Sequence, residues 1–216
     1  MSPPAWLIVA ALTGAASAAS LTPLTHRLLR DQPTSPGWTS TLPTTLTVVV
    51  TAALFAALAW RSPTALVPAA WCLAAVALPL TVLDLAVRRL PDVLVGPAYG
   101  AAAFALTATA IHSGLWWPLL RAVVCSAIAG TAMLTLALAR AGQLGLGDVK
   151  LAALTTLVTG AHSVTAAILA LVGAFVAAAI IAVALLITGR VSGRSTRPFG
   201  PYLLAGALVT LLAVPL

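Results

Sequence analysis

Seven stretches of at least 18 residues in this chain contain no Asp, Glu, Lys or Arg. About 20 apolar residues in an α-helix span the roughly 30 Å hydrocarbon core of a bilayer, so each stretch is near or above the length of a membrane helix. One stretch, 151–189, is long enough for two helices, with a break expected near residues 160–163. The stretches are 1–26, 32–60, 62–83, 93–120, 122–139, 151–189 and 198–216.

Composition indicates the same class of protein. Of the 216 residues, 61% are hydrophobic and only 7% are charged, and the mean hydropathy is +1.09. A soluble domain carries about 25% charged residues, so this chain lacks the polar surface that water would require. We predict an all-α, polytopic membrane helical bundle of about eight transmembrane helices surrounded by the lipid bilayer. The expected helices are roughly 4–23, 43–60, 65–83, 93–111, 117–139, 148–160, 163–188 and 199–216.

Basic residues predict the orientation. No Lys or Arg precedes the first apolar run, and Arg27 follows it, which is the reverse of a secretory signal peptide and favours a retained first helix. With the N- and C-termini outside, nine of the eleven Lys and Arg residues lie on the cytoplasmic side, as the positive-inside rule requires. The exceptions are Arg61 and Arg121, and we expect Arg121 to extend toward the outer interface.

Several function classes are excluded by the same patterns. The net charge of +7 is spread in small groups between apolar runs, without the basic, aromatic-interleaved face of a nucleic-acid-binding protein. Cys72 and Cys125 form no C-x-x-C pair, which argues against a structural zinc site. The three histidines fall on both sides of the membrane. We therefore expect no metal, no other cofactor and no nucleic-acid partner.

Two of the four acidic residues, Asp84 and Asp148, lie at cytoplasmic ends of expected helices. Ionisable groups at a membrane boundary usually mark function. If two carboxyl groups meet there, the ionised one can take a proton from water while the neutral one donates to a peptide carbonyl. The alternatives are an ordinary helix N-cap for Asp148 and a boundary polar residue for Asp84.

Residues beside Asp148 fit such a site. Gly145 and Gly147 permit positive φ angles and close backbone approach, so that the chain can turn tightly into the helix that carries Asp148. Lys150 either brings positive charge to the pair or anchors its helix at the interface.

Three segments together resemble the type IV prepilin peptidase family. Residues 84–92 (DLAVRRLPD) resemble its first motif, an Asp followed by basic residues and Ile-Pro-Asn, with Pro91 and Asp92 at the last two positions. Residues 145–150 (GLGDVK) resemble its Gly-x-Gly-Asp-x-Lys motif. A C-terminal Pro-Phe-Gly-Pro block is matched by Pro198, Phe199, Gly200 and Pro201. The resemblance covers roughly residues 65–216.

This resemblance implies a membrane aspartyl endopeptidase of the bacterial cytoplasmic membrane. Such an enzyme removes the basic leader from prepilins or pseudopilins, which carry an apolar helix and serve type IV pili or protein secretion, at the cytoplasmic face. Asp84 and Asp148 match the catalytic pair, Gly145, Gly147, Lys150, Pro91 and Asp92 match motif support, and the Pro198–Pro201 block matches a structural element. Asp92 replaces the family's Asn, and we expect it to cap the helix 93–111.

Domain organisation follows from the same comparison. Many members carry a cytoplasmic insert with two C-x-x-C pairs and methyltransferase activity, which this chain lacks. We expect a single membrane-embedded peptidase domain over 1–216, with divergent helices in 1–64 and a catalytic core in 65–216. Two alternatives remain open at this point, a proton-coupled transporter that uses Asp84 and Asp148 as relay sites and a non-catalytic membrane scaffold.

Overall fold

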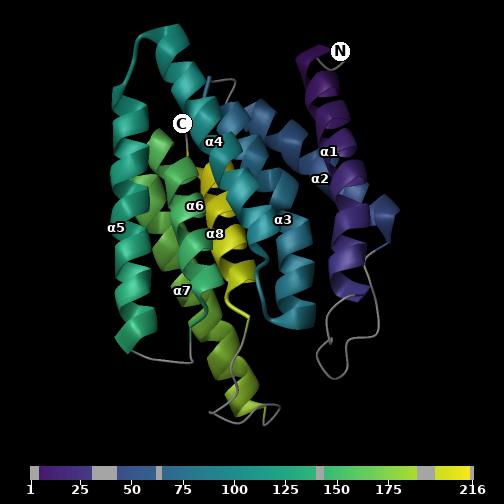
Figure 1. Cartoon of the computed structure of the whole chain (residues 1–216), viewed down its shortest axis with the longest axis vertical. Coiled ribbons are helices and arrows are strands. Elements are labelled where there is room, and N and C mark those ends of the chain that lie inside the picture. The colour runs from purple at the N-terminus through teal and green to yellow at the C-terminus, as the bar shows by residue number, and fades with distance from the viewer. Residues whose placement is uncertain (1–4, 31–42, 62–64, 140–143, 189–197, 215–216) are drawn as a thin grey trace.

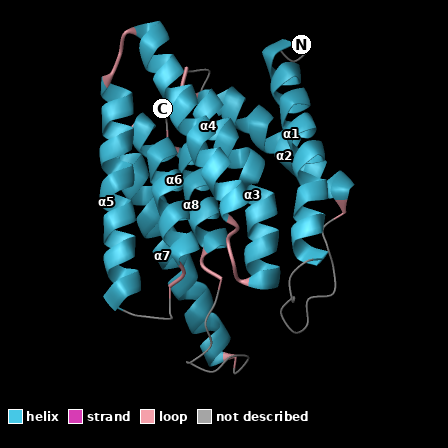
Figure 2. Cartoon of the chain, in the orientation of Figure 1, coloured by secondary structure: helices cyan, strands magenta, loops and turns pink. Residues whose placement is uncertain are grey.

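The computed structural model describes residues 5–30, 43–61, 65–139, 144–188 and 198–214. These residues form eight α-helices and no β-strand, which confirms the predicted helical bundle (Figure 2). The helices are α1 (Ala5–Arg30), α2 (Thr44–Arg61), α3 (Val67–Val87), α4 (Asp92–Ser113), α5 (Trp117–Ala139), α6 (Leu146–His162), α7 (Val164–Ile187) and α8 (Gly200–Ala213).

Six of these helices, α1 to α5 and α7, are long and apolar enough to cross a membrane. The other two are shorter, with 17 residues in α6 and 14 in α8. At 1.5 Å per residue they are about 26 and 21 Å long, less than the roughly 30 Å hydrocarbon core.

Three helix boundaries differ from the sequence prediction in a way that matters for function. Helix α1 continues through Pro23 to Arg30, α3 continues past Asp84 to Val87, and α6 begins at Leu146, so that Asp148 lies within its first turn. A charged residue ends an apolar run in the sequence, but a helix continues through it where the side chain is exposed, as at Arg27, or finds a polar partner, as at Asp84.

Successive helices alternate in direction through the bundle (Figure 1). At one end α3 finishes and α4, α6 and α8 begin, and we call this the pocket end. The opposite end holds the start of α1 and the end of α8 (Figure 1). Helices α1 and α2 pack against each other and against α3, on the flank away from α5.

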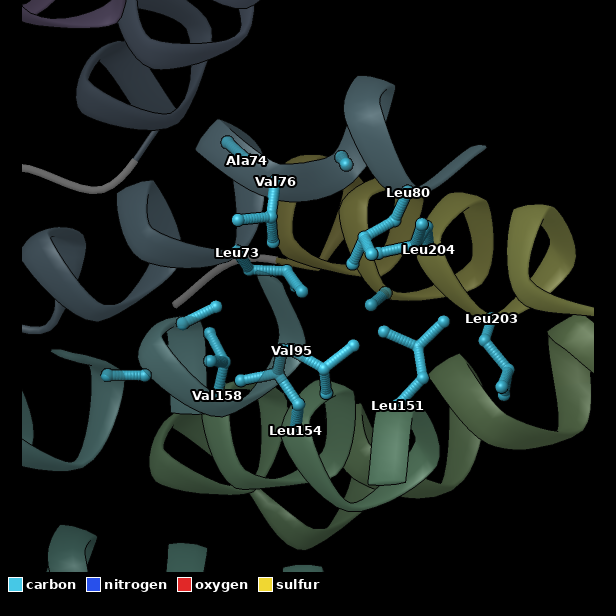
Figure 3. Packing of buried hydrophobic residues seen from close by; sticks show 14 of the residues in the cluster. Leu73, Ala74, Val76, Leu80, Val95, Leu151, Leu154, Val158, Leu203 and Leu204 are labelled. Atoms are coloured by element: carbon cyan, nitrogen blue, oxygen red, sulfur yellow. The ribbon is translucent and has the colours of Figure 1, made fainter. Parts of the chain in front are cut away.

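The centre of the bundle is built by α3, α6 and α8. Side chains from these helices and from α4 interdigitate in one cluster, shown in Figure 3 by Leu73, Leu80, Val95, Leu151, Leu154, Leu203 and Leu204. Close helix contact depends on small residues. A Cβ atom added at Gly160 of α6 would lie 2.7 Å from the Cβ of Cys125 in α5, so the two helices meet where only glycine fits.

The structure gives Arg121 partners that the sequence did not predict. Its Nε donates to the carbonyl of Gly160 at 2.8 Å, and its guanidinium also donates to the carbonyls of Ala161 and His162. These carbonyls belong to the last turn of α6, where no intrahelical N–H is available to them. The guanidinium therefore caps a neighbouring helix.

Candidate active site

Asp84 and Asp148 line the same pocket, although 64 positions separate them in the sequence. The pocket has a volume of about 460 Å³ and lies at the pocket end of the bundle. Its lining comes from α1, from the end of α3 with the turn into α4, and from the start of α6. The lining residues are Leu28, Leu83, Asp84, Val87, Arg88, Arg89, Leu90, Pro91, Asp92, Gly145, Leu146, Gly147, Asp148 and Lys150.

Asp84 is held in place by the first residue of α8. Its side chain is 4% exposed, and its Oδ2 accepts a hydrogen bond of 2.8 Å from the backbone N–H of Gly200. This N–H lies at a helix N-terminus, where donors lack intrahelical partners and negative charge is favoured. A Cβ at position 200 would lie 2.7 Å from that same oxygen, so glycine is needed for the contact.

Asp148 occupies the third position of α6 rather than the N-cap. The N-cap is Gly145, whose backbone N–H donates to Asp148 Oδ2 at 3.2 Å. This is the returning half of a capping box; glycine has no side chain to supply the other half. Asp148 is therefore not the N-cap residue of α6. Its carboxylate instead accepts a hydrogen bond from the backbone of the N-cap residue, Gly145.

In this segment glycine serves close packing at Gly147 rather than a turn with positive φ. Gly114 alone among the described glycines has a positive φ angle, so Gly145 and Gly147 do not use the positive φ that glycine permits. Close approach is confirmed at Gly147, where a Cβ would lie 2.8 Å from the Cβ of Leu90. Gly147 thus lets the start of α6 pack against the turn between α3 and α4.

Asp92 and Lys150 form an ion pair beside the two aspartates. The Lys150 Nζ lies 2.7 Å from Asp92 Oδ1, and both side chains are exposed. The expectation that Asp92 caps its helix is wrong, since Pro91 is the N-cap and Asp92 the first residue of α4. The pair connects the starts of α4 and α6 above the pocket, and it draws the third carboxylate toward a lysine.

The turn after α3 brings positive charge to the pocket. Arg88 has φ 56° and ψ 34°, the left-handed conformation that commonly ends a helix, and its N–H donates to the carbonyl of Asp84 at 2.9 Å. Left-handed backbone is uncommon for a residue other than glycine. Arg88 and Arg89 both line the pocket, so its lining carries positive charge as well as the two carboxylates.

This arrangement provides two carboxyl groups with different tethers in one solvent-reachable pocket. In each, Oδ2 accepts from a backbone N–H, and the described residues give Oδ1 no hydrogen-bond partner. These Oδ1 atoms, which accept from no described donor, are the ones that a water molecule or a peptide group can reach. The described residues contain no group of three His, Cys, Asp or Glu side chains that could hold a metal ion.

Of the residues predicted from sequence, Asp84, Pro91, Asp92, Gly145, Gly147, Asp148 and Lys150 all line this pocket. Pro198 to Pro201 do not line it, but Gly200 contacts Asp84 directly. Leu28 and the left-handed Arg88 were not singled out by sequence reasoning. Leu28 was missed because the first helix was expected to end at residue 23. Arg88 could have been found, because a helix that ends shortly before Pro91 needs a C-cap residue, and Arg88 and Arg89 are the candidates.

Comparison with known proteins identifies a family. A family model described as the type IV leader peptidase family matches residues 69–187, which is more than half of the chain and includes Asp84 and Asp148. The matched segment ends before Gly200. No curated protein and no solved structure matches the chain.

Proposed function

The chain belongs to the type IV leader peptidase family, and on this basis we propose that it is an aspartyl endopeptidase whose catalytic pair is Asp84 and Asp148. It removes the basic leader of prepilin-like proteins at the cytoplasmic face of the bacterial inner membrane. Family membership supports a membrane-embedded peptidase. The choice of aspartates, the substrate and the side of the membrane are the proposal.

One observation carries the assignment of the pair. Three of the four acidic residues line one pocket of about 460 Å³, and Asp84 and Asp148 reach it from different helices. Burying a carboxyl group in an apolar bundle costs free energy, so carboxyl groups found there usually have a function. The third described carboxylate, on Asp92, is occupied by Lys150, which leaves Asp84 and Asp148 as the acid–base groups.

The chemistry needs one proton between the two carboxyl groups. The ionised member takes a proton from a bound water, whose oxygen attacks the carbonyl carbon of the scissile peptide. The neutral member donates its proton to the carbonyl oxygen, which gives a tetrahedral diol. Collapse of this diol returns a proton to the leaving amine, and the C–N bond breaks. Acid and base roles belong to the pair, because closely placed carboxyl groups titrate together.

Charge distribution supports a basic leader followed by an apolar helix. The enzyme's Arg27, Arg30, Arg88 and Arg89 mark one membrane boundary at the pocket end. A substrate with basic residues before an apolar helix obeys the same positive-inside rule. Its junction between basic and apolar segments then lies at the level of Asp84 and Asp148, which is where the leader would be cut.

The direct test uses the full-length protein in lipid nanodiscs with a prepilin-like peptide substrate. Asp84→Asn and Asp148→Asn should each lower the cleavage rate by at least roughly 10³-fold, since each removes one acid–base group. Asp92→Asn is the matched control at the third carboxylate and should retain most activity. Cleavage is measured by mass spectrometry of both products. Full activity in either Asp84→Asn or Asp148→Asn would exclude the pair.

Two further measurements define the mechanism and the substrate. The rate should rise and then fall with pH, because one carboxyl must be ionised while the other is protonated. Replacing the leader's Lys and Arg residues with Gln should reduce cleavage. If a peptide without these basic residues were cleaved equally well, recognition of a basic leader would be excluded, but the assignment of the catalytic pair would stand.

A further inference from the structure

The end of the bundle opposite the pocket contains two arginines with the same unusual arrangement. Arg121, in the first turns of α5, donates to the carbonyls of Gly160, Ala161 and His162 in α6. Arg61, the last residue of α2, donates from Nε to the carbonyl of Leu212 at 2.7 Å and from its guanidinium to Ala213 at 3.2 Å in α8. Each arginine therefore caps the C-terminus of a neighbouring helix.

The capping of α6 accounts for all of its terminal carbonyls. An α-helix leaves its last four C=O groups without intrahelical donors. In α6 the carbonyl of Thr159 accepts from the N–H of Ser163, and the carbonyls of Gly160, Ala161 and His162 accept from Arg121. Such satisfaction is required in lipid, where water is not available to replace a missing donor. The positive charge also lies at the negative end of the helix dipole.

These two arginines stand out by their position as well. Among the described residues they are the only Lys or Arg at the opposite end of the bundle, against the tendency of basic residues to gather at one membrane face. The two helices that they cap are the two shortest, α6 and α8. Those same helices supply Asp148 and the Gly200 N–H at their other ends.

The arginine caps control where α6 and α8 lie along their own axes. A helix is stiff along its axis, so a shift at its C-terminus appears at its N-terminus. Interdigitated apolar side chains oppose sliding without directional contacts, and hydrogen bonds to a planar guanidinium add a directional restraint. The described polar contacts of α8 with other helices occur only at its two ends, through Arg61 and through Gly200 and Asp84. In α6, Ser126 adds a bond to the carbonyl of Ala153.

We propose that Arg61 and Arg121 are positioning residues, which fix the axial positions of α8 and α6 and thereby hold the Gly200 N–H and Asp148 in register with Asp84. This inference rests on the proposed function of the aspartate pair. It assigns to the far end of the bundle a part in catalysis, although neither arginine touches the pocket.

The test compares Arg121→Gln and Arg61→Gln with the full-length wild-type protein in lipid nanodiscs. Hydrogen–deuterium exchange should rise in α6 for the first variant and in α8 for the second, with little change in the other helix. The kcat for leader cleavage, corrected for folded protein, should fall about ten- to a hundredfold, the usual consequence of a small misplacement of catalytic groups, while KM stays within about twofold. Arg121→Lys keeps the charge and should retain more activity than Arg121→Gln.

His112→Gln is the control, since it changes an exposed side chain in the last turn of α4, at the same end of the bundle and outside the described pocket lining, and should leave kcat unchanged. Increased exchange with an unchanged kcat per folded molecule would overturn the proposal and reduce the arginines to local caps. Unchanged exchange would overturn the capping argument itself. Exchange does not depend on the reaction, so either result differs from failure of the aspartate pair, which would appear as activity in the Asp→Asn variants.

Discussion

Most of α6 and all of α7 come from one charge-free stretch of sequence, 151–189, but the two helices occupy opposite environments. From Leu154 to Ala161 every residue of α6 is buried, whereas α7 buries four alanines in its first half and no residue from Phe175 to Ile187. Helix α7 is the more apolar of the two and the most apolar of the six candidate spans. In this bundle, therefore, the most hydrophobic helix is at the lipid-facing periphery and a less hydrophobic one is at the centre.

This difference shows what hydropathy measures in a membrane protein. It reports the transfer of a segment from water, and lipid tails are as apolar as the inside of the bundle. The position of a helix within the bundle depends instead on close packing and on polar groups that find partners. Helix α6 has Gly160 against Cys125, three buried threonines and an aspartate, all of which need protein neighbours.

The largest expected effect on stability comes from truncating a buried leucine of α6. Leu154→Ala should lower the free energy of unfolding by about 2–5 kcal/mol, because Leu154 is fully buried and the cavity would not close. Ile180→Ala in α7 is the matched variant, with a side chain that is 62% exposed, and should change stability by less than about 0.5 kcal/mol. Unfolding in mixed detergent micelles measures both. Equal losses would show that the two helices are packed alike.

A pair of glycines gives a second, smaller contrast. Gly160→Ala in α6 should cost about 1–3 kcal/mol by overpacking, since the new methyl group would lie 2.7 Å from the Cβ of Cys125. Gly173→Ala in α7 has nothing within 4 Å of its methyl group and should be neutral or slightly stabilising. Thermal unfolding of the purified variants compares them. A stable Gly160→Ala protein would mean that α5 and α6 separate without penalty.

The smallest effect is expected at the polar start of α6. Lys150→Gln removes an ion pair whose side chains are 52% and 71% exposed, and such pairs contribute about 0–1 kcal/mol. Its effect on stability should shrink further at high salt, because exposed charges are screened. Unfolding curves at low and high salt check this. A loss of several kcal/mol would place Lys150 among the residues that α6 needs for packing, which the structure does not indicate.

Sequence reasoning reached the helices and the chemistry but missed their relations in space. The eight helices, the break between α6 and α7 near Ser163 and seven of the pocket residues, among them Asp84 and Asp148, were predicted. The partners of Arg121, Asp92 and Gly200 were not, because each lies at least 39 positions away in the chain. No local pattern indicates which distant carbonyl or carboxylate a side chain or backbone N–H will meet.

The sequence by itself determined that this chain is a helical membrane protein of the leader peptidase type, since long charge-free runs and short motifs are local properties that survive in one dimension. Tertiary structure alone decided that Asp84 and Asp148 share a pocket, that α8 supplies a hydrogen bond to Asp84, and that arginines cap α6 and α8. These contacts depend on how stiff helices lie against one another. In lipid that arrangement follows from the shape of the helix surfaces and from hydrogen bonds between helices, and hydropathy along the chain reports neither.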